Sequence, residues 1–171
     1  MKHDKLIRIV LAALFAAMAC VATMVIQIPI PATNGYINLG DGVVLLGAFV
    51  LGPVYGAAAG GLGSMLADLL LGYAAYAPGT LLIKGLMAFC AALVLCALRG
   101  RTKAAAVSGA LIGELVMVLG YFLYESTCLG YGLGAAAAVI GNVIQGAGGL
   151  ISGVAVYHAL YAIPTIKRSV Y

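Results

Sequence analysis

The sequence predicts an all-α polytopic membrane protein with six transmembrane helices and both termini in the cytoplasm. Three observations support this: the chain is 64% hydrophobic, only 8% charged, and divided by its five prolines and a few polar clusters into apolar segments. Soluble domains average about 25% charged residues, so a soluble globule would lack polar side chains to cover its surface. We expect one transmembrane domain over residues 1–171 in the lipid bilayer, with no nucleic-acid partner.

The apolar segments follow one another with short breaks. They are residues 6–28, 39–52, 54–72, 80–98, 104–124 and 135–162. Crossing a bilayer takes about 20 helical residues, so the second segment is too short for a perpendicular span and should be tilted or partly re-entrant. The first exceeds the length of a signal-peptide core and is expected to remain as a helix.

Basic residues set the orientation. Eight of the nine lie at three places: Lys2, Lys5 and Arg8; Arg99, Arg101 and Lys103; and Lys167 and Arg168. Six crossings put all three places on one side, which the positive-inside rule makes the cytoplasm. The loops 29–38, 73–79 and 125–134 then face outward.

Several polar residues interrupt the apolar segments. Asp68 and Lys84 each lie four residues from the outer end of their segment, or about 6 Å deep at the rise of an α-helix. Equal depth and opposite charge predict an ion pair between the third and fourth segments. The pair would either contribute to a binding site or only hold the two helices together.

A second polar group lies deeper. Glu114, Asn142 and Gln145 fall roughly 10–15 Å below the outer ends of their helices, and Tyr121 shares a helical stripe with Glu114. We expect an outward-opening pocket with the carboxylate and two amides at its base and tyrosines at its mouth. Such a pocket suits a small, flat, polar ring. The alternative is hydrogen bonding that only joins the helices.

The outer loops add further polar and aromatic candidates. Asn38, Tyr73 and Tyr76 are placed at the mouth of the pocket, although some of the outward tyrosines would also fit an interfacial aromatic belt. Neither His3 nor His158 has partners at metal-ligand spacing, and no catalytic constellation is present. We therefore expect a protein that is not an enzyme and holds no metal or cofactor.

The first segment carries small residues on one face. Ala12, Ala13, Ala16 and Ala17 make a flat surface that another helix can approach closely. This face would pack either within the protein or against a partner protein.

Together these residues resemble the substrate-binding S component of an energy-coupling factor (ECF) transporter, an ABC-type vitamin importer of bacteria. The resemblance spans nearly the whole chain and rests on the order and spacing of several short stretches. They are residues 13–17, 35–41, 60–64 with 67–70, 72–73, 78–80 with 83–85, and 141–142 with 145–146. It is strongest to the hydroxymethylpyrimidine, pyridoxine and riboflavin-type subgroup.

The resemblance implies that six helices bind one vitamin near the outer face of the bacterial cytoplasmic membrane, under a lid formed by residues 27–39. It places Lys84, Glu114, Tyr121, Asn142 and Gln145 in pocket regions. Asp41, near the start of the second segment, would cap that helix. The face with Ala13 and Ala17 would meet a transmembrane T component, and two cytoplasmic ATPases would hydrolyse ATP. The absence of tryptophan favours a small ring such as pyridoxine or hydroxymethylpyrimidine.

Two other classes compete with this interpretation. A stand-alone secondary transporter or channel for a small polar solute would often contain an inverted repeat, and residues 1–85 and 86–171 show none. An intramembrane enzyme or assembly factor would need a catalytic set that Asp68, Glu114 and His158 do not form, because they lie at different sides of the membrane.

Overall fold

The structure, a computed structural model, describes residues 2–98 and 102–162. In these residues six α-helices and one β-hairpin follow in the order α1 (Lys2–Val25), β1 (Gln27–Ile30), β2 (Gly35–Asn38), α2 (Gly40–Leu51), α3 (Pro53–Leu71), α4 (Ala77–Ala97), α5 (Lys103–Leu123) and α6 (Ala136–Tyr161). A π-helical turn, Tyr124–Cys128, and a 3₁₀ turn, Gly132–Ala135, join α5 to α6. Each predicted segment coincides with one helix to within four residues. The all-α membrane fold is therefore confirmed.

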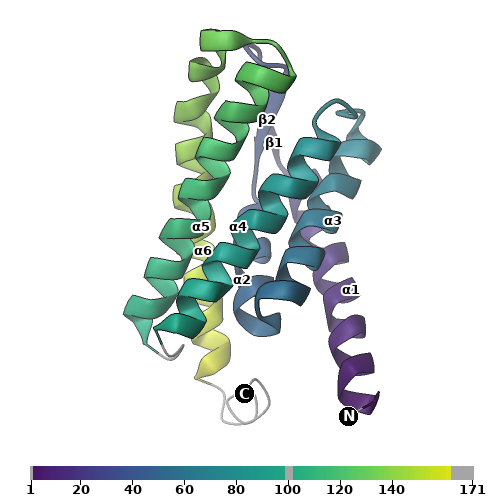
Figure 1. The fold of residues 1–171 in the computed structure, drawn as a ribbon, viewed down its shortest axis with the longest axis vertical. Helices are drawn as coiled ribbons and strands as arrows, with labels where there is room; N and C mark the ends of the chain where they lie inside the picture. Colours follow the sequence, from purple (N-terminus) through teal and green to yellow (C-terminus); the bar gives the residue numbers. More distant parts are fainter. Residues whose placement is uncertain (1, 99–101, 163–171) are drawn as a thin grey trace.

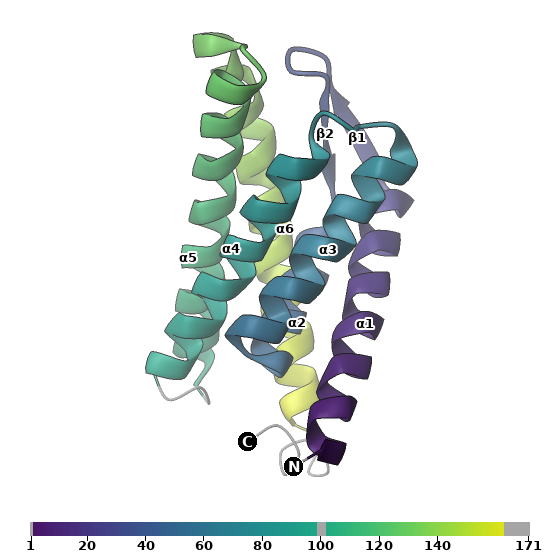
Figure 2. The ribbon, with the colours of Figure 1, turned by 45° about the vertical axis from the view of Figure 1, so that its right-hand side comes forward.

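The helices form one elongated bundle (Figure 1). Five of the described helices are long and apolar enough to cross a membrane, whereas α2 has only 12 residues. The start of α1 and the end of α6 lie at the same end of the bundle, and the hairpin lies toward the other (Figures 1 and 2). Lys5, Arg8 and Lys103 come from helix starts at the first end, which agrees with the predicted orientation. Arg99, Arg101, Lys167 and Arg168 lie outside the described residues.

The short α2 is completed by the hairpin. Strand β2 descends into the bundle, and α2 continues toward the opposite end. The hairpin and α2 therefore follow one another along the long axis of the bundle (Figure 2). The strands pair antiparallel, with Gln27 opposite Asn38 and Ile30 opposite Gly35. Asn34 takes a positive φ of 53° in the connecting turn, a conformation that asparagine tolerates better than most residues. The predicted lid segment 27–39 is thus an ordered hairpin.

Glycines allow the helices to pack closely. An added Cβ at Gly63 of α3 would lie 3.0 Å from the Cα of Ala16 in α1, and one at Gly56 would lie 2.6 Å from the Cα of Ala48 in α2. Helices in lipid gain little from the hydrophobic effect and associate by such close van der Waals packing. The small residues therefore hold α1 and α2 against α3.

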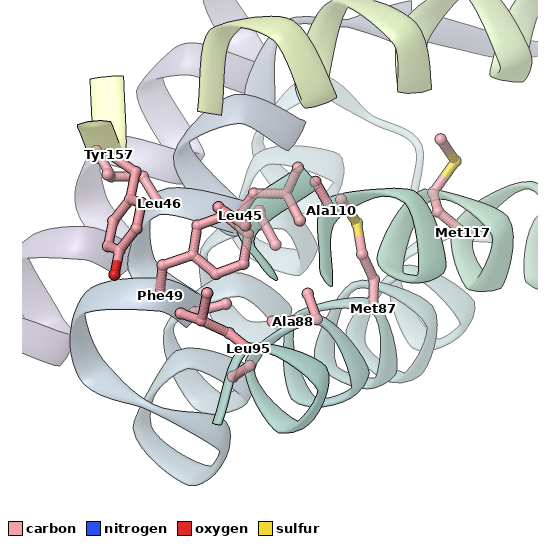
Figure 3. Packing of buried hydrophobic residues seen from close by; sticks show 14 of the residues in the cluster. Leu45, Leu46, Phe49, Met87, Ala88, Leu95, Ala110, Met117 and Tyr157 are labelled. Atoms are coloured by element: carbon pink, nitrogen blue, oxygen red, sulfur yellow. The ribbon is translucent and has the colours of Figure 1, made fainter. Parts of the chain in front are cut away.

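The apolar core fills the half of the bundle away from the hairpin. It joins α2, α4, α5 and α6, with Leu45, Phe49, Met87 and Leu95 fully buried (Figure 3). The ring of Tyr157 packs edge-on against Phe49, with the centroids 5.2 Å apart. This core leaves the polar residues of the other half as the place for a site.

Replacing Gly63 with alanine should destabilise the bundle, because the new methyl group would meet the backbone of Ala16. We expect a loss of about 1–3 kcal/mol, seen as a lower melting temperature of the detergent-solubilised protein. Gly148→Ala is the matched control, since an added Cβ there meets nothing within 4 Å. Equal melting temperatures for the two variants would show that α1 does not pack on α3 as described.

Candidate functional site

A polar pocket lies beneath the hairpin, where α1, α3, α4, α5 and α6 converge. Its lining is Thr23, Ile30, Gly35, Tyr36, Asn38, Ser64, Asp68, Tyr76, Thr80, Lys84, Tyr121, Glu125, Asn142 and Gln145. These side chains close on one another and leave a cavity of about 20 Å³, which is close to the space that one water molecule needs. Lined by many polar groups inside an apolar bundle, this pocket is the candidate binding site.

A buried ion pair forms the base of the pocket. Lys84 Nζ binds Asp41 Oδ1, and the two residues are only 2% and 1% exposed. Gln145 Nε2 donates to Asp41 Oδ2 at 2.8 Å. The Asn38 backbone N–H donates to Gln145 Oε1, also at 2.8 Å. The network therefore connects α2, α4 and α6 to the end of the hairpin.

Two predictions about these charges are wrong. Lys84 pairs with Asp41 rather than with Asp68, and Asp41 makes no capping hydrogen bond at the start of α2. Leu39 is the N-cap of α2, and Asp41 lies in the first turn of this helix. The hairpin descends into the bundle and brings Asp41 to the level of Lys84.

Asp68 binds the hairpin. It is 3% exposed, and its Oδ1 accepts a hydrogen bond of 2.6 Å from the Tyr36 hydroxyl. Burial, with Asp68 beside it, raises the pKa of the Tyr36 phenol, so the phenol stays protonated and donates. The ring of Tyr36 packs against Tyr73, with centroids 4.5 Å apart.

Glu125 is linked to the hairpin through the hydroxyl of Tyr76. It lies in the π-helical turn and is 3% exposed. The Tyr76 hydroxyl lies 2.7 Å from the carbonyl oxygen of Thr33 and 3.0 Å from Glu125 Oε1. One proton serves both acceptors. Burial is the largest cause that raises the pKa of the Tyr76 phenol, which again keeps this donor protonated.

The structure brings together most of the residues predicted to bind substrate. Seven of them line the pocket: Asn38, Asp68, Tyr76, Lys84, Tyr121, Asn142 and Gln145. Tyr73 lies behind Tyr36 and is outside the lining.

Glu114 differs from the expected arrangement. Its carboxylate, 5% exposed, lies beside Asp41 and against Gly146 and Gly149 of α6, outside the pocket wall. Neither of its oxygens has a hydrogen-bond partner among the described residues. Glu114 thus lies next to the ion pair but outside the residues that line the pocket.

Five polar residues of the wall were missed by the sequence analysis: Thr23, Tyr36, Ser64, Thr80 and Glu125. The sequence positions of two of them, Ser64 and Thr80, could have indicated that they belong to the site. Ser64 precedes Asp68 by four residues and Thr80 precedes Lys84 by four, so each shares a helical face with a buried charge. The Thr80 hydroxyl lies 3.0 Å from that of Tyr121.

The small-residue face of α1 divides in two. Ala13 and Ala17 are exposed, whereas Ala12 and Ala16 are partly buried, with the Ala16 backbone against Gly63. Half of the predicted interface therefore packs inside the bundle, and Ala13 with Ala17 remains open to another helix.

The fold and the site define a small membrane-embedded protein with a polar pocket under a hairpin, and the described residues contain no cluster that could hold a metal. The family model for the S component of the ECF-type riboflavin transporter matches residues 4–162, so the chain belongs to this family. It is the binding subunit of a transporter in the membrane and not an enzyme.

Two other comparisons found similar proteins. The chain superposes with a TM-score of 0.67 on a solved S component of a bacterial ECF transporter, covering 95% of this chain and 98% of the other at 22% identity. This likeness supports the fold. An uncharacterized protein in the gap 3′ region of Pyrococcus woesei is 40% identical over 134 residues, which cover 78% of this chain and 87% of that protein.

Replacing Lys84 with methionine should strongly destabilise the protein, because Asp41 would remain buried without its cation. Breaking one side of a buried pair costs about 3–5 kcal/mol. Thermal unfolding of the purified protein measures the loss. The double variant Lys84→Met/Asp41→Asn should recover most of it, and a single variant as stable as the wild type would contradict the pairing.

Proposed function

We propose that this S component binds a small vitamin or vitamin precursor with a pyridine or pyrimidine ring in the pocket beneath the hairpin. Pyridoxine and hydroxymethylpyrimidine are the expected ligands. The observation that carries this proposal is the narrow polar enclosure itself: 14 lining residues surround about 20 Å³. A single ring needs the smallest displacement of the side chains that now fill this space.

The chemistry of the wall supports a flat polar ligand. The amides of Asn142 and Gln145 can donate and accept hydrogen bonds in the plane of a ring. The rings of Tyr36 and Tyr121 offer faces for stacking. The chain has no tryptophan for stacking on a larger ring system.

Riboflavin is the second candidate, because the matching family model describes riboflavin transporters. Its three fused rings exceed the present cavity, so binding it would require a larger outward movement of the hairpin. The hairpin is held by contacts from Tyr36, Asn38 and Tyr76. These contacts would all have to change.

Delivery of the ligand requires the rest of the transporter. We propose that the exposed Ala13 and Ala17 face packs against a transmembrane T component in the bacterial cytoplasmic membrane. Two cytoplasmic ATPases would supply the energy, since the chain has no phosphate-binding loop of the GxxxxGK[ST] type.

Native mass spectrometry of the chain, purified in mild detergent, should show one bound small molecule or stoichiometric uptake from a vitamin panel. Asn142→Ala should weaken binding of that ligand roughly tenfold, the effect of about one lost hydrogen bond. Binding of riboflavin but of no single-ring vitamin would favour the second candidate. Failure of the whole panel would reject the vitamin-binding role.

Ala13→Trp should abolish vitamin uptake by cells while the purified variant still binds its ligand, because the bulky ring would prevent close approach of a partner helix. Leu119→Trp is the matched control, since Leu119 is 59% exposed on α5. Loss of ligand binding in Ala13→Trp would instead show that this face belongs to the folded core.

A further inference from the structure

The unpartnered groups of the pocket wall include the hydroxyls of Thr23 and Ser64, but those that can carry a charge are carboxylate oxygens. The wall contains one cationic side chain, Lys84, and two carboxylates, Asp68 and Glu125. Lys84 is committed to Asp41, which leaves both wall carboxylates without a cationic partner among the described residues. A solute that enters the pocket therefore meets two carboxylates that have no cationic partner.

Each of these carboxylates uses one oxygen and leaves the other free. Asp68 Oδ1 accepts from Tyr36, whereas Asp68 Oδ2 is buried without a hydrogen-bond partner. Glu125 Oε1 shares the proton of Tyr76 with Thr33, and Glu125 Oε2 is likewise without a partner. Two residues from different elements therefore line one pocket, and each has a buried carboxylate oxygen without a partner.

The neighbouring hydroxyls satisfy these carboxylates only in part. Thr80 interacts with Asp68, and Thr33 interacts with Glu125. Neither hydroxyl meets the free oxygen with hydrogen-bond geometry, since Asp68 Oδ2 and Glu125 Oε2 have no partner among the described residues. A buried acceptor without a donor costs about 1–3 kcal/mol, and more when it is charged. A ligand that supplies the donors would recover this free energy on binding.

On the basis of the function proposed above, we propose that Asp68 and Glu125 determine specificity by selecting a ring that carries positive charge or several N–H donors, such as an aminated pyridine or pyrimidine. An amino or ammonium group would donate to Asp68 Oδ2 or Glu125 Oε2. An anionic ligand would bring a like charge beside them and be rejected, a form of selection by repulsion. A neutral ring without donors would leave both oxygens unsatisfied.

Two series of ligands test this with matched ring size. Pyridoxamine, pyridoxine and 4-pyridoxic acid differ at one ring position, which bears a protonated aminomethyl group, a hydroxymethyl group or a carboxylate. In the second series, 4-amino-5-hydroxymethyl-2-methylpyrimidine is compared with its 4-oxo analogue. Isothermal titration of the full chain in detergent measures each affinity, and riboflavin completes the panel.

The aminated member should bind at least about tenfold more tightly than the carboxylate or oxo member of its series. Asp68→Asn and Glu125→Gln should each reduce this ratio several-fold. Both substitutions keep an oxygen that can accept from Tyr36 or Tyr76, so the hairpin contacts survive while the charge is lost. Thr127→Val, at an exposed position near Glu125, is the control and should leave the ratio unchanged.

The outcomes separate this inference from the proposed function. Preferential binding of the carboxylate, oxo or riboflavin ligand, or a ratio unchanged in both variants, overturns the selection by Asp68 and Glu125 while vitamin binding stands. Failure of every ligand to bind overturns both proposals. The wild-type comparison decides the question by itself if a variant does not fold.

Discussion

The ion pair between Lys84 and Asp41 holds the arrangement together. Charges buried in a lipid-embedded bundle are tolerated when they are paired and hydrogen-bonded, and this pair brings α4 and α2 to one depth. Gln145 extends the contact to α6, and the Asn38 backbone joins the hairpin to it. The 12-residue α2 is too short to be positioned by spanning the membrane. Its depth is therefore set by this polar network above and by the apolar core around Leu45 and Phe49 below.

The hairpin and the pocket share their polar groups. Tyr36 binds Asp68, Asn38 binds Gln145, and Tyr76 joins the hairpin carbonyl of Thr33 to Glu125. A solute that engages Asp68 or Gln145 thus acts on the same side chains that hold the hairpin in place. Recognition of the ligand and the position of the hairpin are in this way physically coupled, and no separate hinge is needed to explain the coupling.

Much of the fold could be predicted, whereas the site could be predicted only as a set of residues. Segment 54–72 and helix Pro53–Leu71 agree almost exactly in extent, because apolar runs in lipid must form helices to satisfy their backbone hydrogen bonds. Polar residues such as Asn142 stood out because they are costly there. The predicted ion pair between Asp68 and Lys84 was wrong because the depth of a residue along a helix does not reveal the rotation of that helix or the path of a preceding loop. The expected position of Glu114 at the base of the pocket was wrong for the same reason, because its side chain packs against the glycines of α6.

By itself the sequence determined the membrane class, the succession of helices, and which polar side chains must find partners inside the bundle. These follow from composition and local pattern, since lipid penalises every unsatisfied polar group. Only the tertiary structure decided which side chains these polar groups contact. Asp41 binds Lys84, 43 positions away in the sequence, and Gln145, 104 positions away. Such contacts depend on how far the hairpin descends and how each helix is rotated, and both are set by packing between segments distant in the chain.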